Sequence, residues 1–407
     1  MRNVFVAFAL CALALAGDIP ASGQQKPRAR NLGIPFEGSP GPLNAITDVA
    51  GVEVGYTTLI SGEGALQRGR GPIRTGVTAI LPRGKAKPDP VFGAWFTLNA
   101  AGEMTGTTWL EERGFLEGPI LITNTHSVGV VRDAAIDWML RNGWKFDWTT
   151  PVVAETYDGG LNDINGFHVT KEHAFAALDG AKGGAVAEGN LGGGTGMICH
   201  QFKGGTGTAS RRRTVQSGTY TIGVLVQCNY GSRAQLRIAG VPVGAEITDL
   251  LPCLVPVPGV PEPPAARRCV DGSGGRLDAP GDGSIIIVVA TDAPLLPHQL
   301  KRLAKRASLG IGRMGGTASN GSGDIFVAFS TANPSADVSG IANVQLLGND
   351  QLSPLFEAAV QATEEAITNT LVAAETMTGA DGFRVFGLPH ARLQTVMQKY
   401  NRGTSVR

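Results

Sequence analysis

The stretch Gly281-Asp282-Gly283-Ser284-Ile285-Ile286-Ile287-Val288-Val289-Ala290 carries more structural information than any other part of this chain. Its glycines and aspartate favour a turn, and the turn runs directly into six apolar residues. A short apolar run bounded by turn residues is typical of a strand that is buried on both faces. The sequence therefore predicts a buried strand from Ser284 to Thr291, with a serine as its first residue.

A cut between Gly283 and Ser284 would give this serine unusual chemistry. Ser284 would then carry both a hydroxyl and a free α-amine. An α-amine titrates near pH ~7.7–8, so it can accept the hydroxyl proton at neutral pH without a histidine. A Gly-Ser pair before a strand is also an ordinary turn. The junction alone leaves both interpretations open.

Composition excludes some classes of function. The chain has 407 residues, a net charge of +1, 57 glycines and a hydrophobic fraction of 43%. Such a balance gives no electrostatic footprint for nucleic acid or an anionic membrane, so neither is expected as a partner. The many glycines in a chain of normal apolar content favour a compact, turn-rich α/β protein over a disordered one.

The N-terminus has the pattern of a secretory signal peptide. One positive charge in Met1-Arg2-Asn3 precedes an apolar stretch that ends in Ala14-Leu15-Ala16. The stretch is too short to span a bilayer as a stable helix. Residues 1–16 are therefore predicted to be a signal peptide, and the protein is predicted to be periplasmic or secreted.

Four cysteines follow the predicted signal peptide. Cys253 and Cys269 bracket a Pro-rich loop without a core of its own, so in an oxidising compartment they are candidates for a disulfide. Cys199 and Cys228 lie in apolar, strand-like contexts and are expected to be small buried hydrophobes. No Cys-x-x-Cys or His-Glu-x-x-His spacing occurs, so neither a metal site nor another cofactor is predicted.

Hydrophobic periodicity predicts strands and helices on both sides of the Ser284 junction. The segment from Pro252 to Gly283 changes to Pro, Gly, Arg and Asp and is interpreted as a linker. Without a regular β-α-β alternation, the elements suggest sheets sandwiched by helices. Predicted strands are 51–56, 76–81, 91–98, 219–227 and 284–291, and predicted helices are 127–142, 170–178, one opening at Pro297, and one from Ser353 to a stop at Gly379.

Four further segments are dense in glycine and polar side chains. One of them, Gly189–Gly196, resembles a phosphate loop, but it lacks the Gly-Lys-Ser/Thr ending and the Rossmann spacing, so nucleotide binding is disfavoured. The segments are Asn99–Gly106, Glu155–Asp163, Gly189–Gly196 and Asn320–Asp324.

Together with Val226-Gln227-Cys228-Asn229-Tyr230-Gly231 and the Gly283-Ser284 pair, these segments resemble one family. It is the L-aminopeptidase D-Ala-esterase/amidase family of self-processing serine aminopeptidases, which includes the β-peptidyl aminopeptidases. The resemblance extends from about residue 31 to about residue 400. Further matching segments are Asn124–Gly129, Gly196–His200, Phe202–Gly205 and Thr363–Ile367.

The resemblance implies a precursor that its own serine cuts into an α chain, residues 17–283, and a β chain, residues 284–407. Both chains would form one α/β domain, an α-β-β-α four-layer sandwich like that of N-terminal-nucleophile hydrolases but with different connectivity. The processed pairs would assemble into a homo-oligomer.

The resemblance also assigns catalytic roles. The Gly283–Ser284 bond is the scissile bond and Ser284 is the nucleophile. Ser322 and Asp324 would form a hydrogen-bonded pair that orients Ser284 and its amine. Asn229 would donate to the oxyanion, since a neutral amide stabilises developing charge. Taken alone, these residues also fit ordinary roles in turns and loops.

Two residues are assigned to substrate binding by the same resemblance. Glu155 would bind the free amino group of a substrate, and Tyr157 would line the same pocket. Glu155 directly follows the apolar Val152-Val153-Ala154, where an unpaired charge would be costly, so a surface carboxylate is the weaker interpretation. His126 and His168 are tempting bases but are interpreted as structural, because the amine of Ser284 can serve instead.

The favoured function is release of the N-terminal residue from short peptides, amides or esters through an acyl-enzyme. Three alternatives stay open. One is an oligoamide hydrolase, similar to nylon-oligomer hydrolases. Another is an acyltransferase resembling ornithine acetyltransferase, whose nucleophile is a threonine where this chain has Ser284. The last is an unprocessed binding protein.

Overall fold

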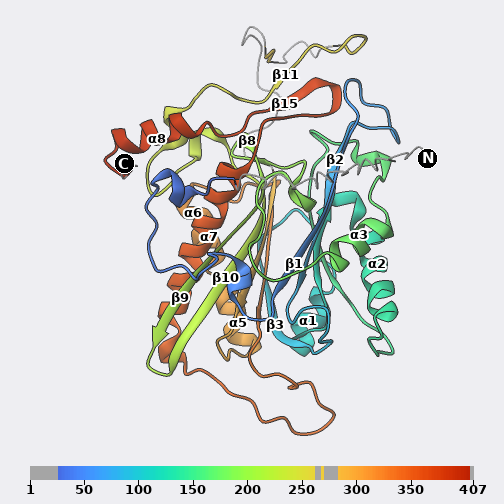
Figure 1. Ribbon diagram of the computed structural model, residues 1–407, viewed down its shortest axis with the longest axis vertical. Coiled ribbons are helices and arrows are strands. Elements are labelled where there is room, and N and C mark those ends of the chain that lie inside the picture. The colour runs from blue at the N-terminus through green and yellow to red at the C-terminus, as the bar shows by residue number, and fades with distance from the viewer. Residues whose placement is uncertain (1–25, 262–266, 270–282, 404–407) are drawn as a thin grey trace, which may run out of the picture.

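The computed structural model describes residues 26–261, 267–269 and 283–403. The predicted signal peptide and most of the predicted linker before Ser284 lie outside these residues. The described chain forms four layers, with two β-sheets face to face and helices on both outer sides (Figure 1). No helix within those ranges is long and apolar enough to cross a bilayer.

The larger sheet has six strands in the order β4-β3-β13-β12-β10-β9. Strand β12 begins at Ser284 and is buried along its whole length, as its apolar run predicts. It pairs in parallel with β13 and antiparallel with β10. The bounds are β3 Val91–Ala100, β4 Phe115–Leu116, β9 Gly205–Val215, β10 Gly218–Asn229, β12 Ser284–Thr291 and β13 Gly323–Ser330.

The smaller sheet has four strands in the order β1-β2-β5-β6. Its inner face meets the inner face of the six-stranded sheet, where Ile80 and Ile122 join Ile286 and Val288 in one hydrophobic core. Because side chains alternate along a strand, the other face of each sheet is left for the helices. The bounds are β1 Glu53–Ser61, β2 Ile73–Leu81, β5 Ile120–Asn124 and β6 Val152–Thr156.

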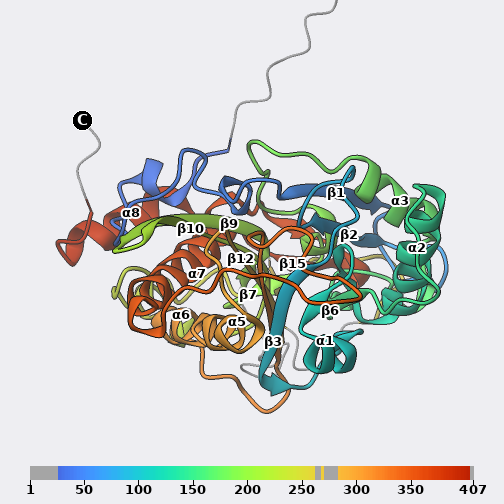
Figure 2. The same ribbon diagram turned by 90° about the horizontal axis from the view of Figure 1, so that it is seen from below.

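Two groups of helices cover the outer faces (Figure 2). Helices α2 (Val128–Arg141) and α3 (Lys171–Asp179) pack on the four-stranded sheet. Helices α5 (Pro297–Ala304), α6 (Ala307–Arg313) and α7 (Ser353–Ala373) pack on the six-stranded sheet. This order of layers confirms the predicted α-β-β-α sandwich.

Short elements complete the chain between the layers and at their ends. A two-stranded hairpin, β7 with β8, lies next to the end of β10, and a separate small sheet has the order β11-β15-β14. The bounds are α1 Thr107–Arg113, α4 Val243–Glu246, α8 His390–Lys399, β7 Ile198–Cys199, β8 Phe202–Lys203, β11 Cys253–Leu254, β14 Met377–Thr378 and β15 Phe383–Val385.

One predicted helix boundary is wrong. Helix α7 ends at Ala373, not near Gly379, because Ala374 turns to an extended conformation. Gly379 serves a different purpose. Its α-carbon packs against the backbone of Leu161, so a side chain there would collide with that backbone. The glycine is a close-approach site rather than a helix stop.

Candidate active site

Ser284 lies at one end of the central strand, between two neighbouring strands. Its register partners are Gly323 in β13 and Asn229 in β10. The Gly323 N–H donates to the Gly283 carbonyl oxygen at 2.9 Å and also lies 3.3 Å from Ser284 Oγ. One backbone donor thus contacts both the carbonyl of the candidate scissile bond and the hydroxyl beside it.

Gly283 is packed too tightly to carry a side chain. A β-carbon at this position would collide with the carbonyl oxygen of Asn229. The turn residue that sequence analysis noted is therefore also a steric requirement, because the backbone before Ser284 runs close against the end of β10. This packing fixes the Gly283 carbonyl relative to the serine hydroxyl.

Ser322 and Asp324 flank the residue opposite Ser284. The Ser322 hydroxyl donates to Asp324 Oδ1 at 2.7 Å. Burial raises the pKa of Asp324 to about 6, although the hydrogen bonds from Ser322 and the Ile285 backbone act to lower it. Within the described residues, Asp324 Oδ2 has no hydrogen-bond partner. The pair forms as the resemblance implies, but none of its described hydrogen bonds reaches Ser284, so its orienting role stays a prediction.

Asn229 is the last residue of β10, and its amide is held from both ends. Its Oδ1 accepts from the Ile198 N–H at 2.7 Å, and its Nδ2 donates to the Tyr157 carbonyl at 3.0 Å. Because one partner can only donate and the other can only accept, the amide has one orientation. Asn229 is the register partner of Ser284 and lines the same cavity, so the second N–H of its amide suits a donor to an oxyanion.

Glu155 is the penultimate residue of strand β6 and is almost fully buried, with 3% of its surface exposed. Its Oε1 accepts from the Glu103 backbone N–H at 3.0 Å, and its Oε2 accepts from Thr125 Oγ1 at 2.5 Å. Burial raises the pKa of Glu155, and these two hydrogen bonds oppose that rise. No described residue forms an ion pair with it, so the carboxylate is available for a cation from outside the protein.

Tyr157 is 54% exposed, and its ring lies over Gly159. Its backbone carbonyl holds the Asn229 amide, as described above. Tyr157 thus has two roles in the site. Its ring lines the cavity, and its backbone carbonyl holds Asn229, the candidate oxyanion donor.

A cavity of about 850 Å³ brings most of these residues together. Ser284, Asn229, Glu155 and Tyr157 all line it, whereas Ser322 and Asp324 lie behind Ser284 and do not. Part of the wall is apolar and comes from a segment that the sequence identified only as a linker. The apolar lining residues are Leu66, Ile198, Leu254, Val255, Val257, Val260 and Phe383.

Neither this apolar wall nor the contacts of Thr125 and Glu103 with Glu155 were predicted from the sequence. The signal was present in Leu254-Val255-Pro256-Val257, which is apolar although the surrounding composition is that of a linker. The segment is fixed by β11, which pairs with β15, and by the Val255 N–H, which donates to the Gly382 carbonyl at 2.9 Å. Glu103 and Thr125 lie in the segments Asn99–Gly106 and Asn124–Gly129, which the resemblance includes, but only the fold places them beside Glu155.

Two disulfides join cysteines within the described residues. Cys253 is bonded to Cys269, with their α-carbons 5.1 Å apart, which closes the loop that carries the apolar wall. Cys199 is bonded to Cys228, with a Cα–Cα distance of 5.7 Å. The interpretation of Cys199 and Cys228 as unbonded hydrophobes is wrong. Both are buried, but the β7–β8 hairpin folds back onto β10 and brings the two sulfurs together.

The histidines do not contribute to this cavity. His168 Nε2 lies 2.8 Å from Asp163 Oδ2, and the His126 ring stacks on Phe167. Neither residue lines the cavity with Ser284. In the part of the chain that the structure describes, no three His, Cys, Asp or Glu side chains are grouped so that they could hold a metal ion.

Two known proteins of similar sequence are named as aminopeptidases. Beta-peptidyl aminopeptidase BapA of Sphingosinicella microcystinivorans is 60% identical over 97% of this chain and 96% of its own length. The BapA of Sphingosinicella xenopeptidilytica is 50% identical over 91% of both chains.

Solved structures share the fold. The L-aminopeptidase D-Ala-esterase/amidase of Ochrobactrum anthropi, described as a variant among the Ntn hydrolase fold, matches with a TM-score of 0.82 and 46% identity over 93% of this chain and 100% of that one. A Burkholderia sp. beta-aminopeptidase matches with a TM-score of 0.78 and 46% identity over 91% of this chain and 98% of that one. The sequence model of peptidase family S58 matches residues 44–385. This match and the 60% identical relative show that the chain belongs to that family.

Proposed function

We propose that this protein is a self-processing serine aminopeptidase that releases the N-terminal residue from short peptides, amides or esters. The observation that carries the proposal is that Ser284 and the buried carboxylate of Glu155 line the same cavity. An N-terminal aminoacyl substrate requires a nucleophile for its carbonyl group and an anion for its ammonium group. Ser284 offers the hydroxyl, and the Glu155 carboxylate has no cationic partner among the described residues.

The first step is processing of the chain. Ser284 Oγ attacks the Gly283 carbonyl carbon, an ester bond forms, the peptide C–N bond breaks, and the hydroxyl proton moves to the departing nitrogen of Ser284. Water then hydrolyses the ester, which leaves the Gly283 carboxylate and the free Ser284 amine. The Gly323 N–H, 2.9 Å from the Gly283 oxygen, stabilises the charge that develops there.

Turnover uses the same hydroxyl with a new base. The freed amine takes the Ser284 Oγ proton as the hydroxyl attacks the substrate carbonyl, and the amine later gives a proton to the leaving amine. The available N–H of Asn229 stabilises the oxyanion. Water releases the acyl group from Ser284, and Ser322 and Asp324 orient the amine from behind.

Glu155 explains why the enzyme acts at the N-terminus of its substrate. Its buried carboxylate pairs with the α- or β-ammonium of the first residue, and an internal residue has no such charge. The name of the 60% identical relative leads us to include β-aminoacyl substrates. The cavity of about 850 Å³ has room for the additional methylene group of a β-amino acid.

The proposal extends to location and assembly. Export by residues 1–16 would place the chain in an oxidising compartment, which suits the two disulfides of the structure. Processed α/β pairs would associate as homo-oligomers. The segment between β13 and α7 exposes large apolar side chains, among them Val338, Ile341 and Leu346, which offer apolar surface for this. Sedimentation of a single α/β pair at working concentration would contradict the oligomer.

A substrate panel tests the proposed function. The purified protein is assayed on α-, D- and β-aminoacyl p-nitroanilides, each with a free and with an acetylated amine. We expect cleavage of the free-amine forms and little cleavage of the acetylated forms. If both forms are cleaved equally well, the aminopeptidase assignment is wrong, and the oligoamide hydrolase alternative takes its place.

A further inference from the structure

The orientation of the Asn229 amide depends on a strand outside the two main sheets. The amide oxygen accepts from the N–H of Ile198, which belongs to the two-residue strand β7. If Ile198 moved away, the amide would lose one of its two fixed partners and could turn, and the N–H₂ group would then leave the position beside Ser284. Something must therefore hold β7 against the end of β10.

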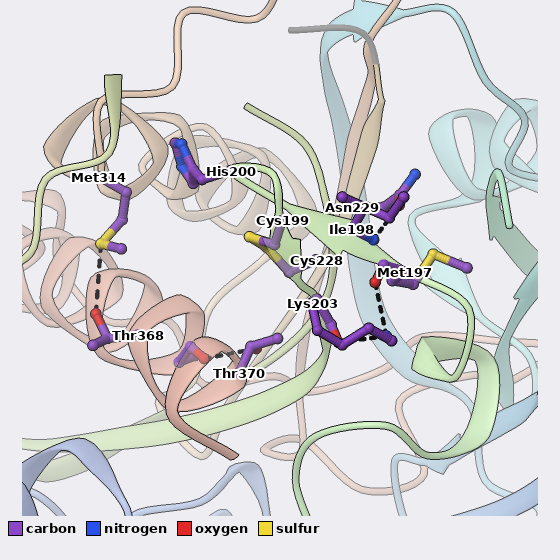
Figure 3. Close-up of a disulfide and its surroundings, with 12 residues drawn as sticks. Met197, Ile198, Cys199, His200, Lys203, Cys228, Asn229, Met314, Thr368 and Thr370 are labelled. Atoms are coloured by element: carbon purple, nitrogen blue, oxygen red, sulfur yellow. Dashed lines mark hydrogen bonds between the residues drawn. A yellow bond between two sulfur atoms is a disulfide. The ribbon is translucent and has the colours of Figure 1, made fainter. Parts of the chain in front are cut away.

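The Cys199–Cys228 disulfide makes that connection. Cys199 directly follows Ile198, and Cys228 directly precedes Asn229. The disulfide on one side and the Ile198–Asn229 hydrogen bond on the other thus close a small ring (Figure 3). Because side chains alternate along a strand, Cys228 points into the core between the six-stranded sheet and its helices, while Asn229 faces the cavity. On the core side, the disulfide holds β7 against β10. On the cavity side, this position of β7 lets the Ile198 N–H donate to the Asn229 amide oxygen.

The hairpin that carries Ile198 has a strained turn. His200 and Gln201 connect β7 to β8, and both have positive φ, 49° and 58°. Non-glycine residues in this conformation persist only where the surroundings hold them, at a cost of about 1 kcal/mol or more each. Backbone bonds contribute, since the His200 N–H donates to the Tyr230 carbonyl at 2.7 Å. The disulfide is the covalent restraint on this turn.

We propose that the Cys199–Cys228 disulfide is a positioning element for the oxyanion donor. It acts through Asn229 and touches neither the substrate nor the reacting atoms. The inference rests on the proposed function, because it takes Asn229 as the donor. A lost oxyanion donor lowers kcat by about 100- to 1000-fold, so a displaced one should lower it by at least about tenfold. KM should change little, because ground-state binding rests on Glu155 and the apolar wall.

The test is a double-mutant cycle with Cys199→Ala/Cys228→Ala and Asn229→Ala. We expect the cysteine pair to lower kcat per processed chain by about tenfold or more, with KM within about twofold. In the Asn229→Ala background the same pair should cost nothing further. Met139→Ala, a substitution on the buried face of α2, serves as a control that lowers the melting temperature without lowering kcat.

The outcomes separate this inference from the proposed function. If Asn229→Ala keeps full kcat, the assignment of the oxyanion donor fails. If Asn229→Ala lowers kcat and the cysteine pair does not, only the positioning role fails. Equal losses of kcat from the pair in both backgrounds would also overturn it, because the disulfide would then act independently of Asn229.

A second measurement avoids dependence on how the alanine pair folds. A Cys253→Ser/Cys269→Ser protein keeps Cys199 and Cys228 as its only described cysteines, and it is made in a reducing cytosol as the dithiol. Oxidised glutathione then forms the disulfide, with two equivalents of glutathione released, and mass spectrometry after alkylation counts the thiols. We expect kcat to rise by about tenfold on oxidation at unchanged KM. An unchanged kcat after complete oxidation would contradict the proposal.

Discussion

At the scale of single residues, Ser284 links processing to catalysis. We expect Ser284→Ala to give a folded, uncut and inactive precursor, because a methyl group cannot attack the Gly283 carbonyl. Ser284→Cys should still cut, since a thiol is a nucleophile. Gel electrophoresis shows one band or two, and Edman sequencing of the smaller wild-type band should begin Ser-Ile-Ile-Ile-Val. Normal cutting of the alanine variant would show that another protease does the processing.

Glu155 gives the second prediction at this scale. Glu155→Gln keeps the shape and removes the charge, so kcat/KM for free-amine substrates should fall by about 30- to 1000-fold, equivalent to roughly 2–4 kcal/mol. Processing should survive, because Gly283 presents no free amine. N-acetylated substrates serve as the control and should lose little further. A loss of the same size on acetylated substrates would contradict the role in binding the ammonium.

The same carboxylate sets an expected pH dependence. Burial raises the pKa of Glu155, so as pH falls the carboxylate gains a proton at a higher pH than an ordinary glutamate does. The ammonium anchor is therefore present above this pKa and lost below it. The acid limb of kcat/KM should disappear in Glu155→Gln, and a limb that persists unchanged would have to belong to another group, such as Asp324.

At the scale of elements, the segment after β11 should control the preference for apolar substrates. Val257→Thr keeps the shape of a wall residue and adds a hydroxyl, so substrates with a large apolar first residue should lose about fivefold in kcat/KM, or about 1 kcal/mol. Alanine-like substrates should change less. Val130→Thr, the same substitution on α2, is the matched control. Equal effects on large and small substrates would show that Val257 does not contact the substrate side chain.

The six-stranded sheet explains how the two chains stay together after processing. Strands β12 and β13 belong to the predicted β chain, and they lie between β3 and β10, which belong to the predicted α chain. Cutting the Gly283–Ser284 bond therefore leaves the backbone hydrogen bonds of two strand pairs across the chains intact. The site depends on both chains, since Asn229 and Glu155 come from one and Ser284 from the other.

At the scale of the whole molecule, a buried ion pair also joins the two chains. Arg211 on β9 lies 2.6 Å from Glu365 on α7, and both side chains are fully buried. Arg30 and Asn44, from the start of the described chain, bind the same carboxylate at 2.7 and 2.6 Å. The carboxylate thus connects the N-terminal segment, the large sheet and the longest helix.

Glu365→Gln should destabilise the protein by about 3–5 kcal/mol, because Arg211 would be left buried without its counter-ion. Burial acts to raise the pKa of Glu365, but Arg30 and Arg211 outweigh it and hold the pKa below its usual value. A lowered pKa contributes stability above the unfolded pKa, and this stability is lost as pH falls through the folded pKa. Thermal unfolding across acid pH measures both effects. Equal melting temperatures for variant and wild type at neutral pH would contradict the prediction.

The sequence determined the central strand. The run from Ile285 to Ala290 is apolar at every position, so it could only be buried on both faces, and the structure places it in the middle of the large sheet. The amphipathic helices α2 and α3 and the buried strand β10 were equally readable, because hydrophobic spacing is a local property. The site residues came from their motifs, and most of them line one cavity.

Only the tertiary structure decided which distant groups meet. Thr125 and the Glu103 backbone hold Glu155, the linker supplies an apolar wall, and Cys199 bonds Cys228 across 29 residues. None of these pairings leaves a periodic trace, because each depends on how separate elements pack. Hydrophobic spacing along a chain shows which face of each element is buried, but only the packed layers bring the side chains of an active site within bonding distance.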